Sequence, residues 1–166
     1  MNKSKDEQEH NISPVYDTES VILILGSFPS VKSRSDGFYY AHPRNRFWKT
    51  VAAVLGEKVP KTIEEKRIFL LAHKIALWDV VGRCEISASS DASIGNVCAN
   101  DVETVLRDSN VKTVFTNGKT AYRLYNKYLA EKCMKKAIPL PSTSPAHASC
   151  SDEDLINEWR IICRYL

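Results

Sequence analysis

A run of basic, aromatic and amide side chains between residues 32 and 49 is the part of the sequence best equipped for chemistry. Tyr40 offers a flat ring on which a nucleic-acid base can stack, and Asn45 offers an amide that can orient a water or hydrogen-bond a base or sugar. Basic residues interleaved with aromatic ones suit contacts with phosphates and bases. A solvated face over a partly buried aromatic cluster is the alternative, and Asn45 could instead cap a helix.

Two further candidates follow apolar runs that are typical of buried strands. Asp79 interrupts the apolar run 75–81, where its carboxylate could accept a hydrogen bond from a base N–H, cap a turn or pair with an arginine. Gly26 ends the run 21–25, and a glycine there lets the backbone approach a ligand closely. Donors near Ser27 and Phe28 could then bind a base carbonyl, although a tight strand-to-loop turn explains Gly26 equally well.

Hydroxyl groups between two prolines follow the last predicted strand, in the segment Leu-Pro-Ser-Thr-Ser-Pro-Ala-His at 140–147. A rigid loop with outward-facing donors suits a grip on the phosphate backbone of DNA. We therefore predict phosphate contacts from Ser142, Ser144, His147 and Arg44.

Several other functional classes lack their sequence signatures. Asn-Gly-Lys-Thr at 117–120 looks like the end of a P-loop, but position 113 is Thr where that motif needs Gly. A plain strand-to-helix turn is therefore favoured over a nucleotide triphosphatase. The chain has no Gly-x-Ser-x-Gly elbow and no Gly-x-Gly-x-x-Gly loop, which disfavours acyl transfer and generic dinucleotide binding.

The elements that must position these residues alternate between strands and helices. This alternation predicts an α/β fold, three-layer α/β/α with a central, mostly parallel four-stranded sheet, whose ligands bind beyond the carboxyl ends of the strands. A long loop with a helical turn is expected over 27–44 and a polar loop over 82–100. Strands are expected at 21–25, 75–81, 112–116 and 137–140, and helices at 45–55, 62–73 and 101–107, from about 119, and after Ser151.

Length and composition set the remaining expectations. The 166 residues predict a flexible tail at 1–12 and a single domain at 13–166. A net charge of +3 permits contact with a polyanion without requiring it. No apolar run approaches the roughly 20 residues that span a bilayer, and residues 1–10 lack a signal-peptide core, so a cytoplasmic location is expected. Five scattered cysteines predict reduced thiols, with no metal site and no iron–sulfur cluster.

Taken together, the segments resemble the uracil-DNA glycosylase superfamily over roughly residues 14–165. The run Ala-His-Pro-x-Asn-Arg-Phe-Trp-Lys at 41–49 is similar to that of mismatch-specific uracil-DNA glycosylases. The fuller pattern resembles the hypoxanthine-DNA glycosylase branch, also called DNA-deoxyinosine glycosylase. Its motifs here are Gly-Ser-Phe-Pro-Ser (26–30), Tyr-Tyr-Ala-His-Pro-Arg-Asn (39–45), Leu-Trp-Asp-Val-Val (77–81), Ser-Ser-Asp-x-Ser-Ile (89–94), Asn-Gly-Lys-x-Ala (117–121) and Leu-Pro-Ser-Thr-Ser-Pro-Ala (140–146).

The resemblance implies a monofunctional DNA glycosylase of base excision repair, acting as a monomer and without a cofactor. Such an enzyme flips a deaminated base, here hypoxanthine, out of double-stranded DNA and hydrolyses its N-glycosidic bond with water. Most of the superfamily carries Asp or Asn at the first-loop position that Phe28 occupies, so the resemblance implies that Asn45 is the catalytic residue. Ser27, Phe28, Tyr40 and Asp79 are then expected to bind the base.

Two alternatives stay open at this stage. The same fold could act mainly on uracil or on mismatches, but Ser-Thr-Ser-Pro at 142–145 replaces the His-Pro-Ser-Pro of classical uracil enzymes, so uracil excision is expected to be weak. A non-catalytic DNA-binding module is the second alternative, and the apolar Phe28 favours it.

Overall fold

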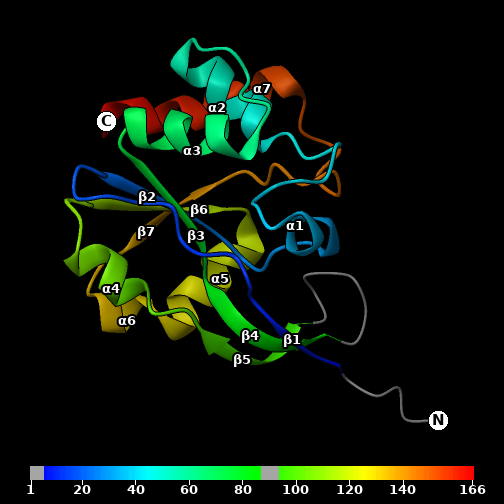
Figure 1. Cartoon of the computed structure of the whole chain (residues 1–166), viewed down its shortest axis with the longest axis vertical. Helices are drawn as coiled ribbons and strands as arrows, with labels where there is room; N and C mark the ends of the chain where they lie inside the picture. Colours follow the sequence, from blue (N-terminus) through cyan, green and yellow to red (C-terminus); the bar gives the residue numbers. More distant parts are fainter. Residues whose placement is uncertain (1–5, 87–93) are drawn as a thin grey trace.

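The centre of the computed structural model, which describes residues 6–86 and 94–166, is a sheet of four parallel strands. The strands are β2 (Ile22–Gly26), β3 (Ile75–Asp79), β6 (Thr113–Asn117) and β7 (Ala137–Leu140), in the order β3-β2-β6-β7. Helices cover both faces of this sheet (Figure 1). The predicted three-layer α/β/α fold with a central parallel sheet is confirmed.

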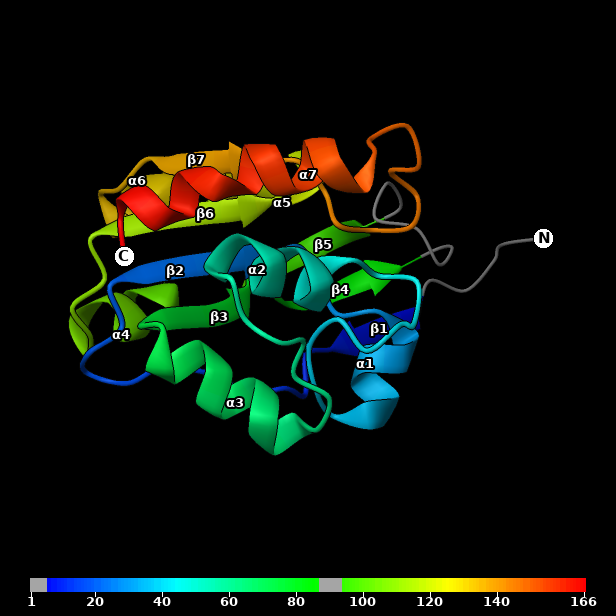
Figure 2. The same ribbon diagram turned by 90° about the horizontal axis from the view of Figure 1, so that it is seen from above.

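The helices divide between the two faces of the sheet. On one face lie α2, α3 and α7, the face seen in Figure 2, and on the other lie α4, α5 and α6, while α1 belongs to the loop after β2. The bounds are α1 Val31–Asp36, α2 Phe47–Leu55, α3 Ile63–Ala72, α4 Val102–Arg107, α5 Lys119–Tyr128, α6 Ala130–Cys133 and α7 Asp152–Trp159, with a 3-10 turn at Arg160–Arg164.

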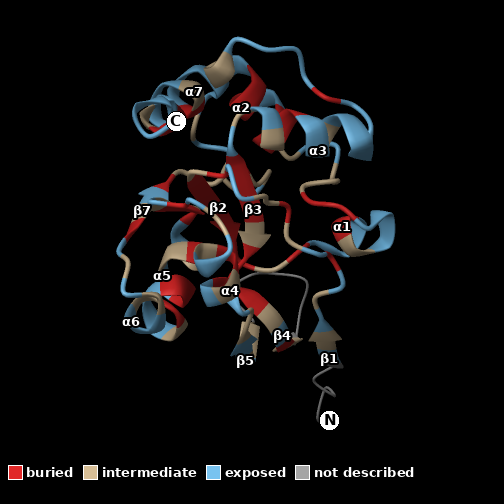
Figure 3. Cartoon of the chain, turned by 60° about the vertical axis from the view of Figure 1, so that its left-hand side comes forward, coloured by how far each residue is buried: buried red, intermediate tan, exposed pale blue. Residues whose placement is uncertain are grey.

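Each strand of the central sheet is buried on both faces, which explains its continuous apolar sequence. Along β2, Ile22 and Ile24 join the core under α2, α3 and α7, whereas Leu23 and Leu25 join the core under α4 and α5. All four side chains are fully buried, and Figure 3 shows these strands as the buried centre of the molecule. The carboxyl ends of the strands are thereby held at one rim.

A second sheet was not predicted. β4 (Val81–Ile86) continues from β3 and pairs antiparallel with β5 (Ile94–Ala99), so the prediction of a loop over 82–100 is wrong for these residues. In β4 only Val81 and Cys84 are buried among residues 81–85, which leaves no clear apolar alternation to detect. Residues 87–93 lie outside the described part, so the motif at 89–94 is described only at Ile94.

The N-terminal segment also differs from the prediction of a flexible tail at 1–12. Residues 1–5 lie outside the described part, but β1 (Asp6–Glu9) pairs antiparallel with β4. Ile12 is buried in the core, because the segment lies along the edge strand β3, where Val15 and Leu77 exchange backbone hydrogen bonds. Residues 6–12 are therefore ordered, while a single domain at 13–166 stays a prediction.

No helix in the described ranges is long and apolar enough to cross a lipid bilayer. The thiols of Cys84, Cys98, Cys133, Cys150 and Cys163 are all free.

Tyr39 fastens the N-terminal segment to the core, and its removal gives a first prediction. The buried Tyr39 hydroxyl donates to the carbonyl of Ser13 at 2.8 Å, and burial raises its pKa, so it stays a donor at all ordinary pH values. Tyr39→Phe should lower the free energy of unfolding by about 1 kcal/mol, measured by urea unfolding. Tyr122→Phe is the matched control, because no hydrogen bond of the Tyr122 hydroxyl is found in the described part. Equal unfolding midpoints for wild type and Tyr39→Phe would contradict the role.

Candidate active site

The predicted site residues lie at or after the carboxyl ends of β2, β3 and β7, at one rim of the sheet. Except for Arg44 they fall into two groups, each joined by neighbouring residues. The Asp79 cluster contains Ser27, Phe28, Tyr40 and Asp79 together with His10 and Gly26, and the Thr143 cluster contains Asn45, Ser142, Ser144 and His147 together with Asn117 and Thr143.

Asp79 is a buried carboxylate at the end of β3, with 3% of its surface exposed. It lies in register with Gly26 of the neighbouring strand β2. A Cβ atom at position 26 would lie 2.2 Å from Asp79 Oδ1 and 2.9 Å from the Tyr40 hydroxyl oxygen. Only glycine leaves room there, so the carboxylate and the hydroxyl converge over the bare backbone of β2.

His10 is the partner of Asp79 that the sequence analysis missed. Its Nε2 lies 2.7 Å from Asp79 Oδ2, and its Nδ1 accepts the backbone N–H of Ile12 at 3.2 Å. Because a backbone N–H can only donate, Nδ1 carries no hydrogen and Nε2 carries the one that Asp79 accepts. No sequence signal linked these residues, since they stand 69 positions apart and His10 was assigned to the tail.

Tyr40 has a backbone conformation that is rare for an aromatic residue. Its φ of 51° lies in the left-handed region, where backbone strain often marks functional sites. The ring stacks on the fully buried Phe47, with centroids 4.1 Å apart and planes 18° apart. One face of the Tyr40 ring is thus covered, and stacking on a base would have to use the other face.

Ser27 and Phe28 continue the chain directly after β2. The carbonyl of Ser27 accepts the backbone N–H of Val81, so this residue is tied to the start of β4. Phe28 is half-buried, with the Arg34 guanidinium 5.3 Å from its ring centroid and the His10 ring edge-on at 6.0 Å. The structure therefore ties Ser27 to the strand that follows Asp79 and sets the Phe28 ring against His10, the hydrogen-bond partner of Asp79.

A directional chain of hydrogen bonds forms the Thr143 cluster. The backbone N–H of Thr143 donates to Asn117 Oδ1 at 3.0 Å, which fixes the orientation of that amide. Asn117 Nδ2 then donates to Thr143 Oγ1 at 2.9 Å, and the Thr143 hydroxyl donates to Asn45 Oδ1 at 2.9 Å. Thr143 is fully buried, so its hydroxyl depends on these two side chains for its hydrogen bonds.

This chain determines which atoms Asn45 presents to a ligand. Asn45 Oδ1 also accepts the backbone N–H of Phe47 at 2.9 Å, so the oxygen takes two hydrogen bonds from the protein. No acceptor for Asn45 Nδ2 is found in residues 6–86 and 94–166. The N-cap residue of α2 is Arg46, so the half-buried Asn45 is not the cap, although its oxygen binds the N–H of the first helical residue, Phe47. Asn45 keeps two N–H donors for a ligand.

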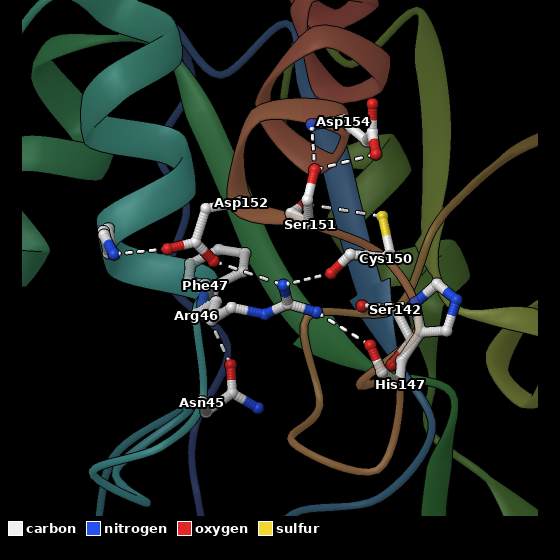
Figure 4. Close-up of polar contacts among 10 residues, drawn as sticks. Asn45, Arg46, Phe47, Ser142, His147, Cys150, Ser151, Asp152 and Asp154 are labelled. Carbon is white, nitrogen blue, oxygen red and sulfur yellow. Dashed lines mark hydrogen bonds and ion pairs between the residues drawn. The ribbon is translucent and has the colours of Figure 1, made fainter.

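Arg46 braces the loop after β7 against the start of α2 (Figure 4). Its guanidinium donates to the carbonyls of Cys150 at 2.7 Å and His147 at 2.9 Å, and it pairs with Asp152 at 3.2 Å. Lys49 also contacts Asp152, and together the two cations hold the pKa of that half-exposed carboxyl below its usual range. Arg46 is thus used within the protein.

Three of the four residues predicted to contact phosphate, Ser142, Ser144 and His147, lie in the loop after β7. Ser142 Oγ accepts the N–H of Ser144, and Ser144 Oγ accepts the N–H of Ala146, so both hydroxyl hydrogens remain available as donors. The Nδ1 of His147 donates to the carbonyl of Ser142, which leaves Nε2 for a ligand. The exposed Arg44 lies in the other loop, and no contact between its side chain and this loop is found in the described part.

The described residues contain no group of three or more His, Cys, Asp or Glu side chains that could hold a metal ion.

Comparisons with known proteins assign the chain and its fold to a family. The model of the uracil DNA glycosylase superfamily matches residues 13–161. A protein of Methanosarcina acetivorans named hypoxanthine DNA glycosylase is 32% identical over 153 residues, which cover 91% of this chain and 95% of the relative. A protein of the same name from Methanosarcina barkeri is 34% identical over 115 residues, 68% of this chain and 72% of the relative.

A solved structure shares the fold as well. The solution NMR structure of a Methanosarcina acetivorans protein, assigned by its name to the uracil DNA glycosylases, superimposes with a TM-score of 0.77. The two chains are 29% identical, and the match covers 93% of this chain and 98% of that one.

The dependence of the Thr143 cluster on one hydroxyl gives a second prediction. Thr143→Val keeps the shape of the side chain, but it leaves Asn117 Nδ2 without its acceptor and Asn45 Oδ1 without one of its donors. The free energy of unfolding should fall by about 1–3 kcal/mol, the usual cost of a buried polar group left without its partner. Thr143→Ser, which restores the hydroxyl, should recover most of this loss in the same urea unfolding experiment. A serine variant as unstable as the valine variant would mean that the methyl group matters instead.

Proposed function

The chain belongs to the uracil DNA glycosylase superfamily and is a DNA glycosylase, and we propose that the base it excises is hypoxanthine, from deoxyinosine in double-stranded DNA. The observation that carries this proposal is the buried Asp79 carboxylate over Gly26, at the rim of the sheet. The two relatives that carry the name hypoxanthine DNA glycosylase support it.

Asp79 supplies the recognition of the base. Hypoxanthine presents a donor at N1–H beside an acceptor at O6, and adenine presents the reverse pattern on the same edge. The N1–H donates to Asp79, and backbone donors near Ser27 and Phe28 bind O6. Adenine would leave buried polar groups without partners, and that cost supplies the discrimination.

The target base has to leave the duplex before it can reach this carboxylate. Tyr40 stacks on the flipped base with the ring face that Phe47 leaves open. Ser142, Ser144, His147 and Arg44 hold the flanking phosphates, His147 only when Nε2 also carries a hydrogen. These contacts position the DNA strand but do not read its base sequence.

Asn45 acts on the bond that breaks. The electron pair of the C1′–N9 bond leaves with the base, water adds to C1′, and the proton that this water loses ends on the departing base or in solvent. Positive charge grows on the sugar and negative charge on the base. Asn45 has only N–H groups to offer, because its oxygen is already used within the protein. It orients the water by donating a hydrogen bond to the water oxygen, and it stabilises the negative charge that develops on the departing base. It does not accept a proton.

Uracil is the second candidate substrate, since it too presents an N–H beside a carbonyl that Asp79 can read. The matching NMR structure is named a uracil DNA glycosylase, which favours uracil as the substrate. The loop at 142–145 lacks the histidine that classical uracil enzymes carry there, so uracil should be the poorer substrate.

A panel of duplexes containing hypoxanthine, uracil or xanthine tests the proposal. Hypoxanthine should be released fastest, detected as abasic sites that break only after alkali treatment, because no contact between a lysine and either cluster is found among residues 6–86 and 94–166 that would allow Schiff-base chemistry. Faster release of uracil would move the assignment to the uracil enzymes. DNA binding without abasic sites on any duplex would make the chain a binding module.

Asn45→Ala tests the catalytic assignment. Excision of hypoxanthine should fall by about 100-fold or more, the scale seen when one donor to a developing anion is removed. Binding of the same duplex, followed by fluorescence anisotropy, should stay close to that of the wild type. The exposed Asn126→Ala on α5 is the matched control and should excise normally. Full activity of Asn45→Ala would remove this residue from the mechanism.

A further inference from the structure

His10 has a role in the site that neither its position in the sequence nor the function of the family assigns. We propose that His10 is a specificity-determining positioning residue, which keeps Asp79 as an oriented carboxylate so that it distinguishes hypoxanthine from adenine. This inference rests on the proposed reading of hypoxanthine by Asp79.

His10 holds the Asp79 carboxylate through a short hydrogen bond. His10 donates to Oδ2 at 2.7 Å, and the two side chains are 1% and 5% exposed. No lysine or arginine pairs with Asp79 within the described ranges. Because Nδ1 of His10 accepts the N–H of Ile12, Nε2 is the nitrogen that donates to Asp79. The carboxylate therefore remains a strong acceptor at Oδ1, the atom that lies over Gly26.

His10 is itself held in place from several sides. Its backbone N–H donates to the carbonyl of Gly82 at 2.7 Å, which ties it to β4. Its ring stands edge-on against Phe28 and Trp78, with centroids 6.0 and 6.5 Å away. A ring fixed by a backbone donor, a strand and two aromatic neighbours can fix the direction of the hydrogen bond it gives.

Loss of this donor has a chemical signature. A buried carboxylate without its partner turns or takes up a proton, since burying an unpaired charge is costly. A protonated Asp79 presents an O–H donor beside a carbonyl acceptor, which matches the edge of adenine. A variant without the His10 donor should therefore lose preference for hypoxanthine over adenine, whereas general damage to the site would weaken both bases alike.

Two substitutions at His10 separate the donor from the ring. His10→Phe keeps a buried flat ring without a donor, and His10→Gln keeps an N–H donor without the ring. Free hypoxanthine and free adenine are used as inhibitors of excision from a hypoxanthine-containing duplex, and the ratio of their inhibition constants is measured. Asn11→Ala is the control, because Asn11 belongs to the same segment and its side chain donates to the carbonyl of Arg34 in an exposed hydrogen bond.

The preference for hypoxanthine should fall by about tenfold or more in His10→Phe, the scale of one lost hydrogen bond to a charged group. His10→Gln should keep most of the preference, and Asn11→Ala all of it. An unchanged ratio in His10→Phe would overturn the inference, as would equal loss of the preference in the two His10 variants. A wild type that releases no hypoxanthine overturns the proposed function instead, so the two failures are distinguishable.

The wild-type protein offers a second measurement that does not depend on the folding of a variant. Nitrogen NMR spectra of the histidine rings report which nitrogen carries the hydrogen. We expect the His10 signals of a neutral ring protonated at Nε2. A ring protonated at Nδ1, or at both nitrogens, overturns the inference.

Discussion

The site depends on a close approach between two neighbouring strands. The parallel register of β2 and β3 sets Gly26 opposite Asp79, and only a residue without a side chain leaves room for the carboxylate at this point. The same space admits the hydroxyl of Tyr40. The ring of Tyr40 stacks on Phe47, and its backbone takes a strained left-handed conformation. A single backbone position thus determines how strand, carboxylate and aromatic ring can meet.

The site combines two ways of holding polar groups still. Asp79 is oriented by one donor from a distant segment, whereas Asn45 is oriented through a chain that passes from Asn117 to Thr143. In both cases the protein uses one face of the functional group and leaves the other for a ligand. Such groups need no rearrangement when charge develops beside them, which is what electrostatic catalysis requires.

The sequence predicts the central sheet well, because strands such as β2 are buried on both faces and are apolar throughout. It predicts β4 and β1 poorly, since their stability comes from pairing partners that local patterns do not reveal. Ser27, Phe28, Tyr40 and Asp79 could be proposed from the sequence because each lies at or after the end of a strand or in a recognisable motif. His10 and Thr143 act through contacts across 69 and 98 positions, so their roles become visible only in the fold.

The Arg46 brace has a consequence for how the protein meets a large ligand. One guanidinium holds two carbonyls of the loop after β7 and the carboxylate of Asp152 at the start of α7, a geometry that suits the planar fork of arginine and not the single ammonium of lysine. Ordering a free loop on association costs about 1–2 kcal/mol per residue in lost backbone freedom. Because Arg46 already holds this loop in the folded protein, much of that entropy is lost on folding and not on binding. We therefore expect the loop to meet a large ligand as a rigid body, without a slow rearrangement.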